Sequence, residues 1–158
     1  MSTPPTSRPT ARLAALGLSL PVPPKPVAAY VPWKRVGNDL YIAGQIPFAE
    51  GKLLAAGIVP EPISLDLARA CARQCALNAL AIIADALGSL DAVDQVVRLG
   101  VFVACGPAFV DHPKVANGAS ELMVEVFGEA GRHARAAVGA SSLPLGAPVE
   151  VEMLIRCA

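Results

Sequence analysis

The sequence predicts an α+β fold in two layers, in which two helices pack on one face of a mixed sheet. The chain has 158 residues, enough for a single domain with one core. Two segments have helical spacing with capping residues at their ends, and Val-rich segments with strand-like alternation surround them. The predicted order is strand, strand, helix, strand, helix, strand, strand.

The first 26 residues are predicted to form a Pro-rich extension, and residues 27–158 the folded domain. A short apolar run follows two arginines, an arrangement that also occurs in signal peptides. The prolines directly behind the run favour one short helical turn near residues 11–18 and a stiff polyproline-like connector instead. These prolines are Pro21, Pro23, Pro24 and Pro26.

The segment "VAAYVPWKRVGNDLYIAGQIPF" predicts two short strands around a turn at residues 37–39. A long helix is then expected from Ser64 to Leu87. Ser64 can serve as its N-cap, and Gly88 suits the left-handed position behind its last residue.

"AVDQVVRLGVFVAC" predicts a strand because it is rich in valine and alternates. Its expected inner side contains Val93, Gln95, Val97, Leu99, Val101 and Val103. "HPKVANGASELMVEVFG" predicts the second helix, with Pro113 in its first turn and Gly128 behind it. The expected inner face of this helix contains Val115, Ala119, Leu122, Met123 and Val126.

The last two predicted strands cover residues 133–142 and 149–157. Alternation along the final strand directs Glu150 and Glu152 away from the helices. On the preceding strand the more apolar phase is Ala134, Ala136, Val138 and Ala140. This phase is expected to face the helices, which places Arg135 on the same side as the two glutamates.

An arginine and two glutamates on one sheet face support two interpretations. They can be solvated surface charges, whose ion pairs contribute only about 0–1 kcal/mol each. They can also line a polar cleft, in which the planar guanidinium of Arg135 binds an anion and a glutamate handles a proton or a water. If the last two strands form a hairpin, Arg135 and Glu150 lie about three to five residues out of step, roughly 10–17 Å.

Composition limits the partners and cofactors. Thirteen basic and 13 acidic residues balance, and aromatic residues are 4%, so nucleic acid is not expected as the main partner. No stretch approaches the roughly 20 uninterrupted apolar residues of a membrane span. The four cysteines show no Cys-x-x-Cys spacing, so we expect free thiols in a reducing cytoplasm and no metal. A mean hydropathy of +0.51 suggests that part of the surface is covered in an oligomer.

Four stretches resemble the Rid family (YjgF/YER057c/UK114) of enamine/imine deaminases: "LYIAGQIPF", "CALNALAIIADALGSLDAVDQVVRLGVFV", "NGASEL" and above all "GRHARAAVGASSLPLGAPVEVE". The resemblance covers roughly residues 27–158. It implies a chorismate-mutase-like fold and a homotrimer, in which the sheets form a central barrel and ligand clefts lie between subunits. It also implies hydrolysis of small 2-enamino or 2-imino acids to 2-oxo acids, without a metal or an organic cofactor.

The resemblance also assigns roles to residues of this chain. Arg135 matches the arginine that binds the substrate carboxylate, and Glu150 matches the glutamate credited with activating water. Tyr30, Gly44 and Asn117 match residues that line the cleft or contact the ligand.

Two positions depart from the family pattern. Ala43 and Ala137 stand where the deaminases often carry hydroxyl or thiol residues, so polar contacts to substrate or water are lost. A non-catalytic trimer that binds small carboxylates or partners at the same cleft is therefore the alternative function. A ribonuclease activity is the further rival, and His133 is the one histidine worth testing for it. Neutral charge and few aromatic residues argue against this activity.

Overall fold

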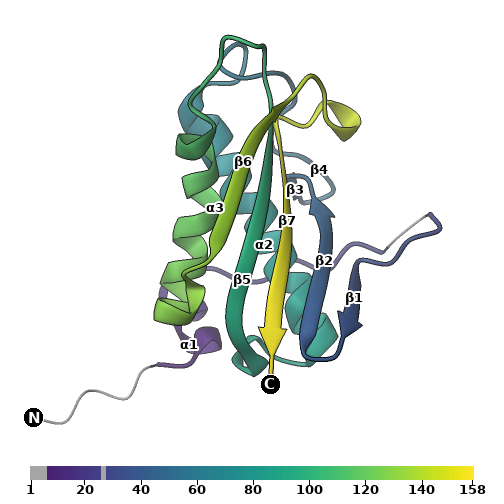
Figure 1. Ribbon diagram of the computed structural model, residues 1–158, viewed down its shortest axis with the longest axis vertical. Helices are drawn as coiled ribbons and strands as arrows, with labels where there is room; N and C mark the ends of the chain where they lie inside the picture. The colour runs from purple at the N-terminus through teal and green to yellow at the C-terminus, as the bar shows by residue number, and fades with distance from the viewer. Residues whose placement is uncertain (1–6, 26–27) are drawn as a thin grey trace, which may run out of the picture.

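The computed structural model describes residues 7–25 and 28–158. The predicted order of strands and helices is confirmed, and the short helical turn expected near residues 11–18 is present as helix α1 (Figure 1). A small β3–β4 hairpin after β2 was not predicted. The helices are α1 (Pro9–Ala15), α2 (Leu65–Leu87) and α3 (His112–Phe127). The strands are β1 (Trp33–Val36), β2 (Asp39–Gln45), β3 (Phe48–Ala49), β4 (Lys52–Leu53), β5 (Val93–Ala104), β6 (Ala134–Ala140) and β7 (Val149–Cys157).

Five strands form a mixed sheet in the order β1-β2-β7-β5-β6. The β5–β6 pair is parallel and the other pairs are antiparallel. β6 and β7 are consecutive in the chain but do not form a hairpin, because β5 lies between them. Helices α2 and α3 lie behind this sheet and leave its other face uncovered (Figure 1). The predicted two-layer arrangement is therefore confirmed.

Helix α2 has the predicted caps. The Ser64 hydroxyl accepts a hydrogen bond from the Leu67 amide, and Gly88 adopts the left-handed conformation, with φ of 81°. Among the described residues, α2 alone is long and apolar enough to cross a membrane by length and composition. Over half of its apolar window is buried in the protein, and core helices of soluble proteins meet the same criterion, so this is weak evidence for a membrane span.

Helix α3 begins at His112, with Asp111 as N-cap and Pro113 in its first turn. All five residues of its predicted inner face are buried against the core. The C-terminal strand β7 also follows its predicted alternation, since residues 149, 151, 153, 155 and 157 are buried and the intervening ones are not. The sheet therefore presents its apolar side to the helices.

Strand β5 departs from its predicted alternation. Its register with β7 shifts between Val93 and Gln95 and again between Val96 and Arg98. These bulges change which side chains point inward, so Val96 is buried while Gln95 is exposed. From Leu99 onward the expected inner phase is confirmed, with Leu99, Val101 and Val103 buried.

The predicted orientation of strand β6 is wrong. Arg135 pairs with the buried Leu99 of β5, and residues directly opposite each other on paired strands point to the same face. Arg135 therefore lies on the helix side of the sheet, against α3. The side chains of Ala134 and Val138 face away from the helices. They lie opposite Arg98 and Phe102 of β5, respectively.

The segment before β1 is not only an extension. Leu13 of α1 is buried in the common core, and the Thr10 amide donates to the Asp91 carboxylate at 2.9 Å. This hydrogen bond lowers the pKa of Asp91 below its ordinary value. The expected domain boundary falls on residues 26 and 27, which lie outside the described residues, but helix α1 ahead of it packs on the same domain.

Candidate functional site

Arg135 on the edge strand β6 contacts helix α3. Its Nη1 donates to Asn117 Oδ1 at 2.9 Å and to Ser120 Oγ at 3.1 Å, and its Nη2 donates to the Pro113 carbonyl at 3.5 Å. The side chain is half-buried, and all three acceptors are neutral oxygens. Within the described residues no carboxylate forms an ion pair with Arg135, so its charge is left for another anion.

The hydrogen bonds of Arg135 leave a defined part of the guanidinium unused. A guanidinium has five N–H donors, and both hydrogens on Nη1 point to partners in α3. The Nε–H and one hydrogen on Nη2 have no partner among the described residues. These two neighbouring donors match the two oxygens of a carboxylate. Arg135 is thus held by one side and can bind an anion with the other.

A second layer of hydrogen bonds supports this arrangement. Ser120 Oγ lies 2.9 Å from His133 Nε2, and His133 Nδ1 lies 2.7 Å from the Gly131 carbonyl. The carbonyl can only accept, so Nδ1 carries the proton and Nε2 accepts the Ser120 hydroxyl. Ser120 thus accepts from Arg135 and donates to His133. Burial lowers the pKa of His133, and the nearby Arg135 charge lowers it further.

Glu150 lies on the other face of the sheet, beside Gly44. A Cβ atom built at Gly44 would lie 2.5 Å from Glu150 Oε1, so a larger residue here would force the Glu150 carboxylate to move. Burial raises the pKa of Glu150, and the charge of Glu152 raises it further. A carboxylate with a raised pKa is suited to accept a proton from water near neutral pH.

The five predicted site residues therefore form two pairs and one separate residue. Arg135 and Asn117 meet on the helix side of the sheet, and Gly44 and Glu150 meet on the open side. Tyr30, ahead of β1, is 59% exposed and joins neither pair. Along β5, Arg135 lies opposite Leu99 and Glu150 opposite Phe102. Arg135 and Glu150 are thus two strands apart across the sheet and three residues apart along it. These separations place their Cα atoms roughly 14 Å apart.

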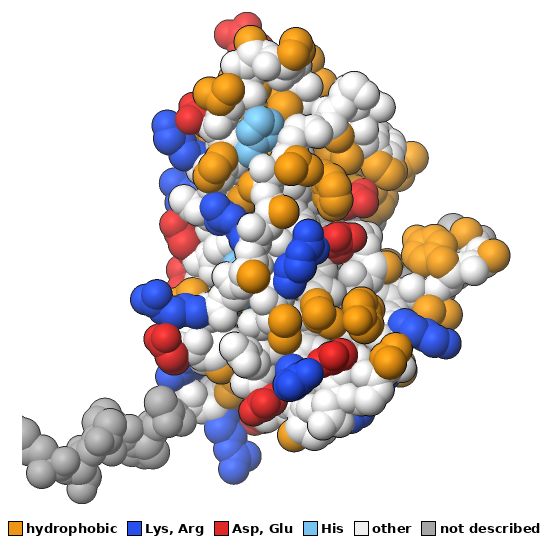
Figure 2. Space-filling view, viewed as in Figure 1, with side chains coloured by type: hydrophobic (Ala, Val, Ile, Leu, Met, Phe, Trp, Pro, Cys, Tyr) orange, Lys and Arg blue, Asp and Glu red, His pale blue; other side chains and the backbone are white. Residues whose placement is uncertain are grey.

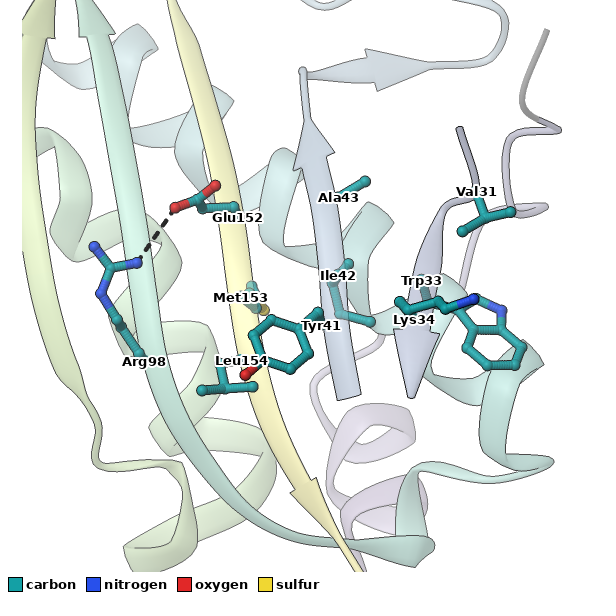
Figure 3. A pocket seen from close by; sticks show the side chains of 10 residues that line it. All are labelled: Val31, Trp33, Lys34, Tyr41, Ile42, Ala43, Arg98, Glu152, Met153 and Leu154. Atoms are coloured by element: carbon teal, nitrogen blue, oxygen red, sulfur yellow. Dashed lines mark hydrogen bonds and ion pairs between the residues drawn. The ribbon is translucent and has the colours of Figure 1, made fainter. Parts of the chain in front are cut away.

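The open face of the sheet carries a cavity of about 390 Å³ (Figure 3). Its walls come from β1, β2, β5, β7 and the segment before β1, and Ala43 contributes to them. The side chains of Tyr41 and Leu154 lie together on its floor, and Arg98 contacts Glu152 at 3.3 Å at its rim. Neither Arg135 nor Glu150 is part of these walls. The cavity is therefore a feature of the uncovered face and not of the surroundings of Arg135.

The uncovered face carries hydrophobic and charged side chains side by side, as Figure 2 shows. The ion pairs Arg98–Glu152 and Arg156–Asp39 lie on it. Exposed Tyr41 and Val138 belong to this face. Within the described part of the chain no group of three or more His, Cys, Asp or Glu side chains could hold a metal ion.

Sequence reasoning missed Ser120 and underestimated His133. Asn117 and Ser120 are three residues apart on α3, so they share one side of the helix, and this spacing was a readable signal. In the sequence, His133 was considered as a residue to test for ribonuclease activity. The structure instead places both of its ring nitrogens in hydrogen bonds behind Arg135.

Comparison with known proteins identifies related chains. Residues 10–155 match the family described as "YjgF/chorismate_mutase-like, putative endoribonuclease". Protein TCP17 of Trypanosoma cruzi is 42% identical over 99% of this chain and 98% of its own length. A 2-iminobutanoate/2-iminopropanoate deaminase of Dermatophagoides farinae is 30% identical over 87% of this chain and 93% of its own. A solved structure from Shewanella oneidensis, described as a "putative endoribonuclease", has a TM-score of 0.91 at 35% identity, covering 95% and 99% of the two chains.

Proposed function

The chain belongs to the YjgF/chorismate-mutase-like family, and on that basis we propose that it hydrolyses small 2-imino and 2-enamino acids to 2-oxo acids. The relative from Dermatophagoides farinae, named for this activity, supports the reaction class. The observation that carries the proposal is Arg135, whose guanidinium is half-buried, held by neutral oxygens and left with two donors for a carboxylate.

In the proposed reaction, Arg135 binds the substrate carboxylate and so fixes the position of C2, the carbon that carries nitrogen. Glu150 takes a proton from a water molecule that attacks C2 of the imine. The proton held by Glu150 passes to the imine nitrogen, so the tetrahedral carbon carries a hydroxyl and an amino group. As this intermediate collapses, the hydroxyl proton moves to nitrogen, the C–N bond breaks, and ammonia leaves the 2-oxo acid behind. An enamine enters the same sequence after it tautomerises to the imine. The chemistry needs one positioned water and no electron transfer.

The two groups must come from different copies of the chain. Within one chain, Arg135 and Glu150 lie on opposite faces of the sheet, and a molecule with a few carbon atoms cannot contact both. We propose that the chain forms a homotrimer in which the open face of the sheet is covered by a neighbouring subunit. The Glu150 of one subunit then meets the Arg135 of the next at a shared cleft.

A direct assay tests this function. A pyridoxal-phosphate dehydratase acting on serine supplies 2-aminoacrylate, and pyruvate release is followed with and without the protein. We expect the protein to accelerate release and Arg135→Ala to lower kcat/KM by at least about 100-fold. Arg132→Ala is the matched control, because Arg132 is a nearby exposed arginine paired only with Glu129, and it should retain activity.

The alternative function is a trimer that binds small carboxylates without converting them. Ala137 lies on the same face as Arg135, and Ala43 lines the cavity of the open face. Because both residues are alanines, neither position supplies a hydroxyl to a ligand. Pyruvate binding is measured separately, for wild type and for Arg135→Ala. If wild type binds pyruvate, Arg135→Ala does not, and wild type fails to accelerate pyruvate release, the binder is favoured over the deaminase.

A further inference from the structure

A second group of reactive side chains lies outside the residues discussed above. Cys105, directly behind β5, has its sulfur 3.4 Å from Nε2 of His112, the first residue of α3. The ring of Phe109 meets the His112 ring edge-on, with centroids 5.1 Å apart and planes at 78°. A histidine in contact with a cysteine thiol can take its proton when the sulfur attacks an electrophile.

Strand β6 leaves room for this pair. A Cβ atom built at Gly139 would lie 2.9 Å from both Cys105 Sγ and His112 Nε2. Any larger residue at this position would therefore push against the thiol and the imidazole at their point of contact. Gly139 keeps the two groups accessible from one side.

A cavity of about 320 Å³ opens beside the pair. Apart from Cys105 and His112, its walls are Gly106, Pro107, Phe109, Gly139, Ala140 and Ser141. These residues include no lysine, arginine, aspartate or glutamate, so the cavity suits a small molecule without charge. Three charged residues on or beside the first turn of α3 are not part of the walls: Asp111 pairs with Lys114 at 3.0 Å, and Arg135 donates to the carbonyl of Pro113, the residue after His112.

Cys105 also differs from the other cysteines. Cys71, Cys75 and Cys157 are buried, while Cys105 is partly exposed at the cavity. Burial raises the pKa of Cys71 to about 11, and it raises the pKa of Cys75 and of Cys105 as well. A thiol that is protonated at neutral pH needs a neighbouring base to react, and His112 is in place to act as one.

We propose that Cys105 and His112 form a nucleophilic site for small uncharged electrophiles of the α,β-unsaturated carbonyl class. As the Cys105 sulfur bonds to the β-carbon, His112 Nε2 takes the thiol proton and the electron pair of the double bond moves toward the carbonyl. The imidazolium then returns the proton to the α-carbon. The product is a thioether on Cys105, and no oxidant or reductant takes part. This site does not depend on the deaminase proposal.

The test uses acrylamide, the smallest neutral member of this class, and intact-protein mass spectrometry with peptide mapping. We expect Cys105 to be modified first, and the rate at pH 7 to fall at least about tenfold in His112→Gln. Gly139→Ala should also slow the reaction, because its Cβ meets both reactive atoms. Cys105→Ser should remove this adduct.

The pH dependence in the wild-type protein makes the test independent of any variant's folding. If His112 is the base, the reaction does not need the free thiolate, so the rate stops rising with pH even though the thiolate concentration goes on increasing. A rate that keeps rising about tenfold per pH unit beyond pH 8 contradicts the proposal, because the bare thiolate is then the nucleophile. Equal rates in wild type and a folded His112→Gln variant, or first modification at another cysteine, also overturn it.

Discussion

Arg135 and Glu150 lie on opposite faces of one sheet, two strands apart, with β5 between them. Arg135 points to α3 and is held there by Asn117 and Ser120. Glu150 points to the uncovered side and lies against Gly44. A single copy of the chain thus keeps the two proposed site residues apart, and the proposed chemistry requires a second copy to bring them together.

Ser120 is expected to position Arg135 rather than to touch the substrate. Ser120→Ala removes an acceptor from Nη1 and the donor to His133, at a cost of about 1–2 kcal/mol. We expect KM to rise about 5- to 30-fold with a smaller change in kcat, as measured in the pyruvate-release assay. Glu121→Gln, a neighbouring exposed position on α3 paired with Arg69, is the control and should leave both constants unchanged. If Ser120→Ala instead lowers kcat by that factor and leaves KM unchanged, Ser120 does not act by positioning Arg135 for substrate binding.

His133 predicts a loss of stability in mild acid. Its folded-state pKa is lowered, so below about pH 6.5 the unfolded chain binds a proton that the folded protein resists. Stability is therefore complete above this pH and falls as the pH drops toward the lower, folded-state pKa. Thermal unfolding between pH 8 and pH 5 should show this decline, and His133→Gln should weaken it. If the thermal midpoint of His133→Gln falls with pH as steeply as that of wild type, His133 is not the cause of the decline.

Glu150 should affect stability in the opposite direction, because its ionised form destabilises the folded protein. Its folded-state pKa is raised, so the folded protein binds the proton first as the pH falls, and ionisation above that pKa costs stability. Glu150→Gln should therefore raise the thermal midpoint near pH 7, and the gain should vanish below about pH 4, where the glutamate is protonated in both states. Glu129→Gln, at a highly exposed side chain, should show no such dependence. A variant less stable than wild type at pH 7 would refute this prediction.

Leu13 tests whether the N-terminal segment belongs to the domain. Its side chain is 5% exposed within the common core, so Leu13→Ala should lower the free energy of unfolding by about 2–3 kcal/mol in denaturant titrations. Leu16→Ala is the matched control in the same segment, because Leu16 is 40% exposed. Equal small effects of both substitutions would show that α1 contributes little to folding.

The elements with strong local signals were predictable from the sequence. Ser64 and Gly88 mark the ends of α2 by capping chemistry, and the regular alternation from Val149 to Cys157 identifies both faces of β7. The two glutamates were therefore placed on the correct face. The order of elements and the family motifs also led to the right fold.

Strand β6 was misjudged because its two phases differ little in hydrophobicity. Ala134, Ala136 and Val138 face the open side, while Ala137 and Gly139 alternate with them beside Arg135. Local alternation cannot decide between two such faces on an edge strand. What orients β6 is its parallel pairing with β5 and the hydrogen bonds of Arg135 to α3, and both are long-range contacts. The bulges that shift the first half of β5 were hidden for the same reason.

The most direct test of the account mixes two inactive variants. Arg135→Ala and Glu150→Gln each lack one half of the proposed site, and they are unfolded, combined in equal amounts and refolded together. If each cleft takes Arg135 from one subunit and Glu150 from its neighbour, random assembly restores roughly a quarter of the clefts and a matching share of pyruvate release. If the mixture stays as inactive as either variant alone, while refolded wild type recovers its activity, the site is not shared between subunits and the central claim is wrong.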